Sequence, residues 1–173
     1  SASQALLMVD VDADSFNITP EIIERAITDK TRAVVPVNLY GQCADLEGIR
    51  KLCDERGLFM IEDNAQAIGA DYLMQSGIKV KSGTVGHIGS TSFYPSKNLG
   101  CLGDGGAVVT NDDELHTIIK KLRNYGSEEK YINEYIGYNS RLDEIQAAFL
   151  NIKLPDLDKQ NDLRRKIASR FLN

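Results

Sequence analysis

The chain has 173 residues, of which 42% are hydrophobic and 26% charged, a composition ordinary for a globular protein with a sizeable core. Its 20 Lys and Arg residues stand against 25 Asp and Glu residues, giving a net charge of −5 without a basic run, so no nucleic-acid partner is expected. No apolar run reaches the roughly 18 residues that cross a membrane, and the first residues lack the pattern of a signal peptide, so we expect a cytoplasmic protein without a membrane partner.

The first part of the chain alternates predicted strands and helices. Residues 5–12 read as a buried strand that ends in aspartates, and because no element precedes it, the chain is expected to start in the middle of a fold. Thr19 and Pro20 predict a helix start, since a capping hydroxyl precedes a proline at the first helical position. The β-branched residues 33–39 predict a strand, and the proline within it favours an edge position or an irregularity.

A second helix and a third strand complete this alternation. Asp45 is the predicted cap of the helix and Gly57 its left-handed stop, and residues 58–62 form the next buried strand. This order predicts an α/β fold with a mostly parallel sheet, right-handed crossovers and helices on both faces, in three α/β/α layers. Ligands of such sheets collect at the carboxyl ends of the strands, which groups Tyr40, residues 63–66 and the loop of Lys97 at one rim.

The second part of the chain is more irregular. Residues 69–87 are expected to form a loop or short hairpin, and two further strands are predicted over residues 90–94 and 106–110. Capping-box spacing at residues 111–114 predicts a helix, and residues 124–140 form a long aperiodic segment that is a candidate functional loop. A helix then begins at Leu142, is interrupted by Pro155, and is followed by a last segment with apolar residues at helical spacing.

Two charged residues at the predicted rim carry the chemistry. A partly buried lysine on a loop can form an imine, although a lone turn lysine such as Lys97 is more often plain surface charge. Asp63 ends an apolar strand, where a carboxylate is costly unless it is paired, for example with a protonated pyridine nitrogen. Together the two would suit a pyridoxal phosphate site. The alternative is that Asp63 caps a helix starting at Asn64 or Ala65.

Other common sites are absent from the pattern. The glycines of residues 100–106 match neither a mononucleotide P-loop nor a dinucleotide fingerprint. His87 and His116 lack metal-ligand spacing, and His87 reads as a loop residue and not as a base. The 3 cysteines are scattered without a C-x-x-C pair, so we expect reduced thiols and no metal.

Several ordered motifs span most of the chain. They read Val-Pro-Val-Asn-Leu-Tyr-Gly-Gln at residues 35–42, Ile-Glu-Asp-Asn-Ala-Gln-Ala at 61–67, Ser-Phe-Tyr-Pro-Ser-Lys-Asn-Leu-Gly at 92–100, Gly-Asp-Gly-Gly-Ala at 103–107, and Gly-Tyr-Asn-Ser-Arg-Leu-Asp-Glu-Ile-Gln-Ala at 137–147. Together these motifs resemble those of one known family, the DegT/DnrJ/EryC1/StrS sugar aminotransferases. The resemblance implies the large domain of a fold type I enzyme that uses pyridoxal 5'-phosphate, with pyridoxamine phosphate as the half-reaction form.

The resemblance also implies roles for five residues. Lys97 would form the imine with the cofactor and later carry a proton between substrate and cofactor carbons, and Asp63 would pair with the pyridine nitrogen. Gln66 would bond the ring hydroxyl and Ser92 the phosphate. Asn139 would reach the phosphate of the neighbouring subunit's cofactor, which makes a homodimer the expected assembly.

The implied reaction moves an amino group from glutamate to a keto sugar linked to a nucleotide diphosphate, with the last motif leaning toward 3-keto sugars, in amino-sugar or lipopolysaccharide biosynthesis. Three positions, Asn38, Asn64 and Ile68, depart from the usual family residues and leave the substrate preference open. The alternatives are a sugar dehydratase of the same family, which has histidine in place of Lys97, and a non-catalytic binding domain.

The resemblance covers only the middle of the family's large domain. Residues 1–155 would be its central part, and residues 156–173 would begin the helix toward a small C-terminal domain. The upstream segment that completes the phosphate cup has no counterpart in this sequence. The chain alone is therefore expected to bind the cofactor weakly or not at all and to be inactive.

Overall fold

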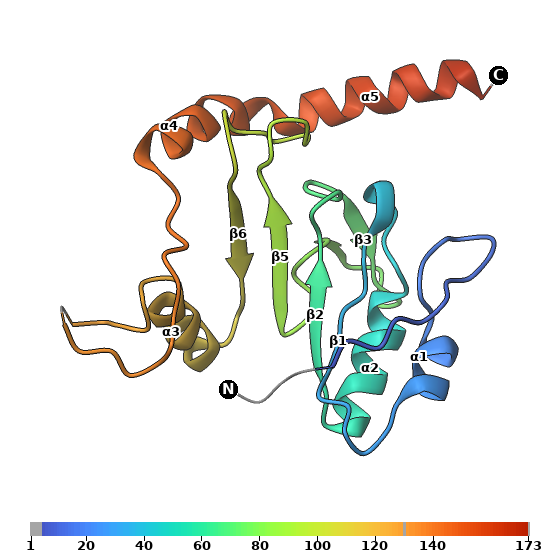
Figure 1. Cartoon of the computed structure of the whole chain (residues 1–173). Coiled ribbons are helices and arrows are strands. Elements are labelled where there is room, and N and C mark those ends of the chain that lie inside the picture. The colour runs from blue at the N-terminus through green and yellow to red at the C-terminus, as the bar shows by residue number, and fades with distance from the viewer. Residues whose placement is uncertain (1–4, 130, 173) are drawn as a thin grey trace.

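A computed structural model describes residues 5–129 and 131–172. Within these residues the central sheet has the strand order β1-β2-β5-β6 (Figure 1). Its strands are β1 (Ala33–Val34), β2 (Phe59–Asp63), β5 (Ile88–Ser92) and β6 (Gly106–Val109). The pairs β1/β2 and β2/β5 are parallel, whereas β5/β6 is antiparallel. The predicted α/β fold with a mostly parallel sheet is thus confirmed, and β1 lies at the edge of the described sheet, as Pro36 just after it favours.

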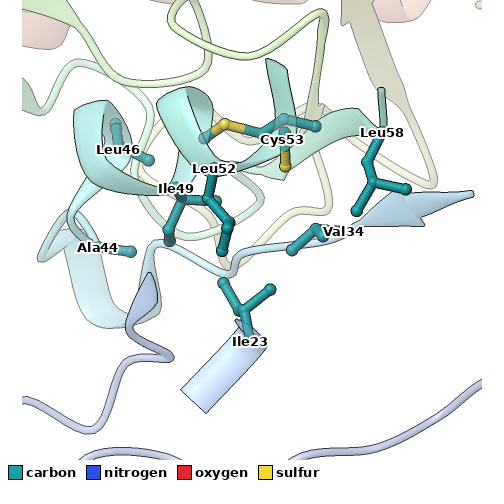
Figure 2. Packing of buried hydrophobic residues seen from close by; sticks show 9 residues of the cluster. Ile23, Val34, Ala44, Leu46, Ile49, Leu52, Cys53 and Leu58 are labelled. Atoms are coloured by element: carbon teal, nitrogen blue, oxygen red, sulfur yellow. The ribbon is translucent and has the colours of Figure 1, made fainter. Parts of the chain in front are cut away.

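Two helices cover one face of β1 and β2. Helix α1 (Pro20–Ala26) begins where Thr19 Oγ1 accepts a hydrogen bond from the Ile22 N–H at 3.4 Å. Helix α2 (Leu46–Arg56) is capped by Asp45 and ends at Gly57, whose φ of 65° suits a residue without a Cβ. Their apolar sides meet the two strands in one core, shown in Figure 2. Its buried members are Ile23, Val34, Ala44, Leu46, Ile49, Leu52, Cys53, Leu58 and Met60.

The other face of β1 and β2 is largely uncovered in the described part of the chain. Side chains alternate along β1 and its continuation, so that Val34 is buried while Val35 and Val37 are 47% and 39% exposed. In β2, Phe59 is 49% exposed and the next residue, Met60, is fully buried. The described helices therefore bury one side of this edge and leave its opposite side to solvent.

The predicted strand over residues 5–12 is wrong. The described residues of this segment form no strand, and its apolar side chains are largely exposed, with Leu6 at 81% and Met8 at 78%. An apolar run becomes a strand only where a neighbouring strand pairs with its backbone, and none of the described strands does so here.

The second part of the chain adds a hairpin and three helices. β3 (Asp71–Leu73) and β4 (Lys79–Lys81) pair antiparallel, as the predicted hairpin requires. The remaining elements are the 3-10 turn η1 (Leu39–Gly41), α3 (Asp113–Leu122), α4 (Glu144–Lys153), the 3-10 turn η2 (Leu154–Asp156) and α5 (Leu157–Phe171). Helix α3 starts one residue later than the capping-box spacing implies, because Asp112 is the residue that caps it.

Helices α4 and α5 follow one another across the end of β5 and β6 at which Ser92 lies (Figure 1). A second, smaller core joins them to the loop after β5, with Leu99, Cys101, Leu150 and Leu157 buried. No helix among the described residues is both long and apolar enough to span a membrane.

Candidate active site

The turn that follows β2 carries the first two candidate residues. Asp63 occupies the strand position after the buried Glu62, so its side chain belongs to the face opposite helices α1 and α2. Its Oδ1 accepts a hydrogen bond from the Ala65 N–H at 3.0 Å. Residues 65 and 66 form a turn, and none of residues 64–67 is helical, which makes the helix-cap alternative wrong. Asp63 Oδ2 accepts no hydrogen bond from any described residue, so one carboxylate oxygen is free for a ligand.

Beneath this turn lies a buried carboxylate that the sequence analysis did not single out. Glu62 is fully buried, yet no cation pairs with it among the described residues. Its oxygens accept hydrogen bonds from the backbone N–H groups of Gly83 (2.7 Å), Val85 (2.7 Å) and Gly86 (2.6 Å), and from Asn38 Nδ2 (3.2 Å). These donors satisfy the charge and hold the segment before β5 against β2.

Two of the residues that depart from the family pattern contact each other in this layer. Asn38 Nδ2 also donates to Asn64 Oδ1 at 3.2 Å, and Asn64 Nδ2 donates to the Ser82 carbonyl at 3.2 Å. Asn38 Oδ1 accepts from the Ala44 N–H at 3.1 Å. Asn38 and Asn64 are thus a matched pair that fixes the start of the turn from below.

Gln66 contacts the 3-10 turn η1. Its Oε1 accepts a hydrogen bond from the Tyr40 N–H at 3.1 Å, as the grouping of Tyr40 with residues 63–66 at one rim requires. The contact leaves the Nε2 group of Gln66 available as a donor. Tyr40 itself has a φ of 55°, which is uncommon for a residue with a side chain, and is 84% exposed.

The lysine lies on a tight turn just beyond β5. Register pairs Asp63 with Ser90, and Ser92 follows two residues later on the same face of the sheet. Ser92 Oγ accepts from the Tyr94 N–H at 3.2 Å, and the Lys97 N–H donates to the Tyr94 carbonyl at 2.8 Å. Lys97 is half-buried, and its Nζ forms no ion pair or hydrogen bond with a described residue.

Asn139 lies apart from the other four candidates. It pairs with Asn124 at the C-terminal end of α3, and the Tyr138 N–H donates to the Leu122 carbonyl at 2.8 Å. Helix α3 follows β6, which runs back toward the end of the sheet where β5 begins (Figure 1). Within one chain Asn139 therefore does not join Lys97.

A hollow of about 310 Å³ lies beside this pairing. Four of its nine lining residues are cationic, namely Lys120, Lys121, Arg123 and Arg141, and of these Lys121 is paired with Glu128 and Glu134. The Arg141 guanidinium lies 5.1 Å from the Tyr125 ring centroid and donates to Asn124 Oδ1 at 2.7 Å. The surroundings of Asn139 are therefore suited to an anion in a chain that is acidic overall.

His87 has a structural contact, as its loop assignment implies. Its Nδ1 accepts a hydrogen bond from the Met60 N–H at 2.9 Å. Partial burial, followed by the nearby Arg50 cation, lowers the pKa of the imidazole below its ordinary value. The neutral ring thus joins the start of β5 to β2.

The model of the DegT/DnrJ/EryC1/StrS aminotransferase family matches residues 3–173. The chain belongs to this family. It is 50% identical over 162 residues to the UDP-N-acetyl-3-dehydro-α-D-glucosamine 3-aminotransferase of Acidithiobacillus ferrooxidans, covering 94% of this chain and 42% of that protein.

Solved structures of other proteins share the fold. S. venezuelae DesV in complex with a ketimine intermediate superimposes with a TM-score of 0.84 at 49% identity, over 92% of this chain and 42% of DesV. NtdA of Bacillus subtilis, with bound cofactor PMP, gives a TM-score of 0.74 at 32% identity, over 89% of this chain and 33% of NtdA. The chain thus spans less than half the length of these relatives.

The residues of this DegT family chain fit a pyridoxal group. The unpartnered amine of Lys97 suits the aldehyde, and the free carboxylate oxygen of Asp63 suits the pyridine nitrogen. The Gln66 amide can donate to the ring hydroxyl, and the Ser92 hydroxyl can donate to the phosphate.

Sequence reasoning missed Glu62 and also Asn161, a residue of α5 whose hydrogen bonds are described below, because the partners of both are distant in sequence. A strongly polar residue within an apolar strand or on a buried helix face is the signal that could have found them.

Proposed function

We propose that the full gene product containing this chain is a pyridoxal-phosphate-dependent aminotransferase acting on a nucleotide-linked 3-keto sugar, with glutamate as amino donor. The observation that carries the proposal is that an unpartnered lysine follows β5 while an aspartate with one free carboxylate oxygen ends β2, the strand beside it. The named activity of the A. ferrooxidans relative, a 3-aminotransferase of a UDP sugar, supports the choice of sugar carbon.

The cofactor would supply an electron sink for the carbon that gains or loses the amino group. Lys97 Nζ would bind it covalently when free of substrate and, once released, move a proton to or from that carbon. Asp63 Oδ2 would accept a hydrogen bond from the ring nitrogen and so keep that nitrogen protonated. Gln66 Nε2 would donate to the ring hydroxyl and Ser92 Oγ to the phosphate.

Asn139 would act across a homodimer. Its distance from the other four residues within one chain and the basic hollow beside it both favour a contact with an anion held by a second subunit. We further propose that the enzyme works in the cytoplasm, in amino-sugar biosynthesis of the kind that supplies lipopolysaccharide. Residues 1–155 would form the central part of the large domain, and residues 156–173 would begin the helix that leads to a small C-terminal domain.

The test is trapping of the cofactor on the full gene product. Pyridoxal phosphate should give a visible absorbance band, and borohydride should then fix a pyridoxyl group on the peptide that contains Lys97. Lys97→Ala should abolish both signals, whereas Lys79→Ala, which removes an exposed hairpin lysine, should leave them intact. A band that survives Lys97→Ala would overturn the assignment.

The reaction is tested with UDP- and dTDP-linked 3-keto sugars. Glutamate-dependent formation of the amino sugar supports the proposal, whereas loss of a sugar hydroxyl without amination would favour the dehydratase, and neither reaction would favour a binding domain. The chain of residues 1–173 alone is expected to bind the cofactor more weakly than the full gene product and to show no turnover.

A further inference from the structure

Helices α4 and α5 contact the lysine loop through three polar side chains. Leu102 N–H donates to Gln146 Oε1 at 2.8 Å, Lys153 Nζ donates to the Gly100 carbonyl at 2.6 Å, and Asn98 Nδ2 donates to Asn161 Oδ1 at 2.7 Å. Asn98 is the residue after Lys97. The helices thus hold the segment that follows the lysine at three points.

Asn161 differs from the other two because it reaches a second part of the candidate site. Its Nδ2 donates to the Ile68 carbonyl at 3.3 Å, and Ile68 lies two residues after Gln66. A single side chain therefore joins the segment after Lys97 to the turn that starts at Asp63. Among the described residues Gln146 and Lys153 bond only the lysine loop.

The surroundings of Asn161 leave it little freedom. The residue is 7% exposed, and Leu157, one helical turn before it, is buried in the small core with Leu99. A Cβ at Gly69 would lie 2.7 Å from Asn161 Nδ2, and Gly69 has a φ of 82°. The turn can approach the asparagine this closely only because residue 69 is glycine.

We infer that Asn161 is a positioning residue that fixes the lysine loop relative to the Asp63–Gln66 turn, an inference that rests on the proposed function for its consequence. The pairing of β2 with β5, together with the hydrogen bond from Thr91 Oγ1 to the Asn64 carbonyl (3.3 Å), fixes where the turn and the lysine loop begin. Lys97 lies five residues beyond Ser92, so its position depends further on the contacts that the lysine loop itself makes. Misplacement of a reacting group by about 1 Å can cost on the order of a hundredfold in rate. Within residues 5–129 and 131–172, Asn161 is the side chain that hydrogen-bonds both the lysine loop and the segment after Gln66.

Hydrogen exchange in the cofactor-free full gene product tests the tie itself. The amides of Ala67 and Ala70 report on the turn, and those of Lys97 and Cys101 on the lysine loop, because all four are hydrogen-bonded. Asn161→Leu should speed exchange at both pairs by about tenfold, the effect of losing one buried hydrogen bond at each loop. The matched control, Gln146→Leu, should affect the lysine loop alone.

A second variant separates the two bonds. Asn161→Asp keeps an acceptor for Asn98 but replaces the donor toward Ile68, so exchange should rise at Ala67 and Ala70 and stay unchanged at Lys97 and Cys101. Equal effects of Asn161→Leu and Gln146→Leu on all four amides, or no effect of either asparagine variant on the turn, would overturn the inference.

Cofactor binding tests the consequence. The dissociation constant for pyridoxal phosphate should rise about tenfold in Asn161→Leu and stay near the unmodified value in Gln146→Leu, even where both lower the melting temperature equally. Equal dissociation constants in the two variants would reduce Asn161 to a stability contact and contradict positioning. An unmodified protein that takes up no pyridoxal phosphate would overturn the proposed function, while the exchange data would still decide whether Asn161 ties the loops.

Discussion

Two halves of the molecule contribute the two sides of the candidate site. The framework half, consisting of α1, β1, α2 and β2, carries Asp63 and has nine buried apolar residues in one core. The lysine half, consisting of β5, β6, α4 and α5, carries Ser92 and Lys97, and its core cluster has four. The lysine half instead uses the polar contacts of Gln146, Lys153 and Asn161. The site thus combines a part fixed by apolar packing with a part held by directional bonds that a few substitutions can release.

The largest expected effect concerns the polar exception in the framework half. Glu62→Leu would leave three backbone N–H donors without their acceptor and would remove one of the two acceptors of Asn38 Nδ2, so we expect a loss of about 4 kcal/mol in the free energy of unfolding. Glu62→Gln keeps one oxygen and should cost about half as much. Urea denaturation measures both free energies of unfolding. If Glu62→Leu left the free energy of unfolding unchanged, apolar packing alone would support the framework half.

Removing one buried apolar side chain from each core should lower the free energy of unfolding by different amounts. Ile49→Ala removes a fully buried side chain from the larger core and should cost about 3–4 kcal/mol, whereas Leu150→Ala in the smaller cluster should cost about 2 kcal/mol because its surroundings can relax. Urea midpoints at constant m-value provide the comparison, and Leu73→Ala at the exposed hairpin should lie within about 0.5 kcal/mol of zero. A larger cost at Leu150 would reverse the contrast between the halves.

The two buried cysteines report on local opening. Cys53 lies in the framework core, where burial raises the pKa of its thiol to about 11, and Cys101 lies in the lysine half. The rate at which a thiol reagent labels each cysteine in the folded protein is divided by the rate for the same cysteine in urea. The resulting ratio should be about tenfold larger for Cys101 than for Cys53, because the less packed lysine half opens at lower free energy. Equal normalised rates would indicate that both halves open together.

The smallest effect is a pH dependence at the junction of the halves. Because the pKa of His87 is lowered in the folded state, the unfolded chain binds more protons just below its ordinary value of about 6.5. The contribution of His87 is therefore complete above that pH and is lost as the pH falls through the lowered folded value. Asn in place of His87 keeps an acceptor for the Met60 N–H but does not titrate. His87→Asn should therefore flatten the dependence of the melting temperature on pH between about pH 5 and 7, the range in which histidines ordinarily titrate. Thermal unfolding measured across this range provides the test.

Local signals predicted most of the framework but only part of the site. Thr19, Asp45 and Gly57 act on residues within one turn of themselves, so the printed sequence carries their effect, and the helix bounds follow. The segment over residues 5–12 has an apolar pattern but no described pairing partner, and such a partner cannot be read from the segment itself.

Long-range contacts account for what the sequence analysis missed. Glu62 meets donors more than twenty residues away, and Asn161 meets Asn98 and Ile68 at separations of 63 and 93 residues. The place of Asn139 depends on β6 being antiparallel to β5, which the strand pattern alone does not reveal. The motif resemblance, in contrast, gave five candidate residues before any of their partners were known, and their roles remain predictions.

The uncovered side of β1 and β2 bears on how this chain behaves in concentrated solution. Val35, Val37 and Phe59 present adjoining aliphatic and aromatic surface, and β1 is an edge strand whose outer backbone groups have no strand partner among the described residues. Surfaces of this kind template pairing between molecules. Residues 1–173 expressed alone should therefore scatter light increasingly with concentration, and a Lys in place of Val35 should raise their solubility.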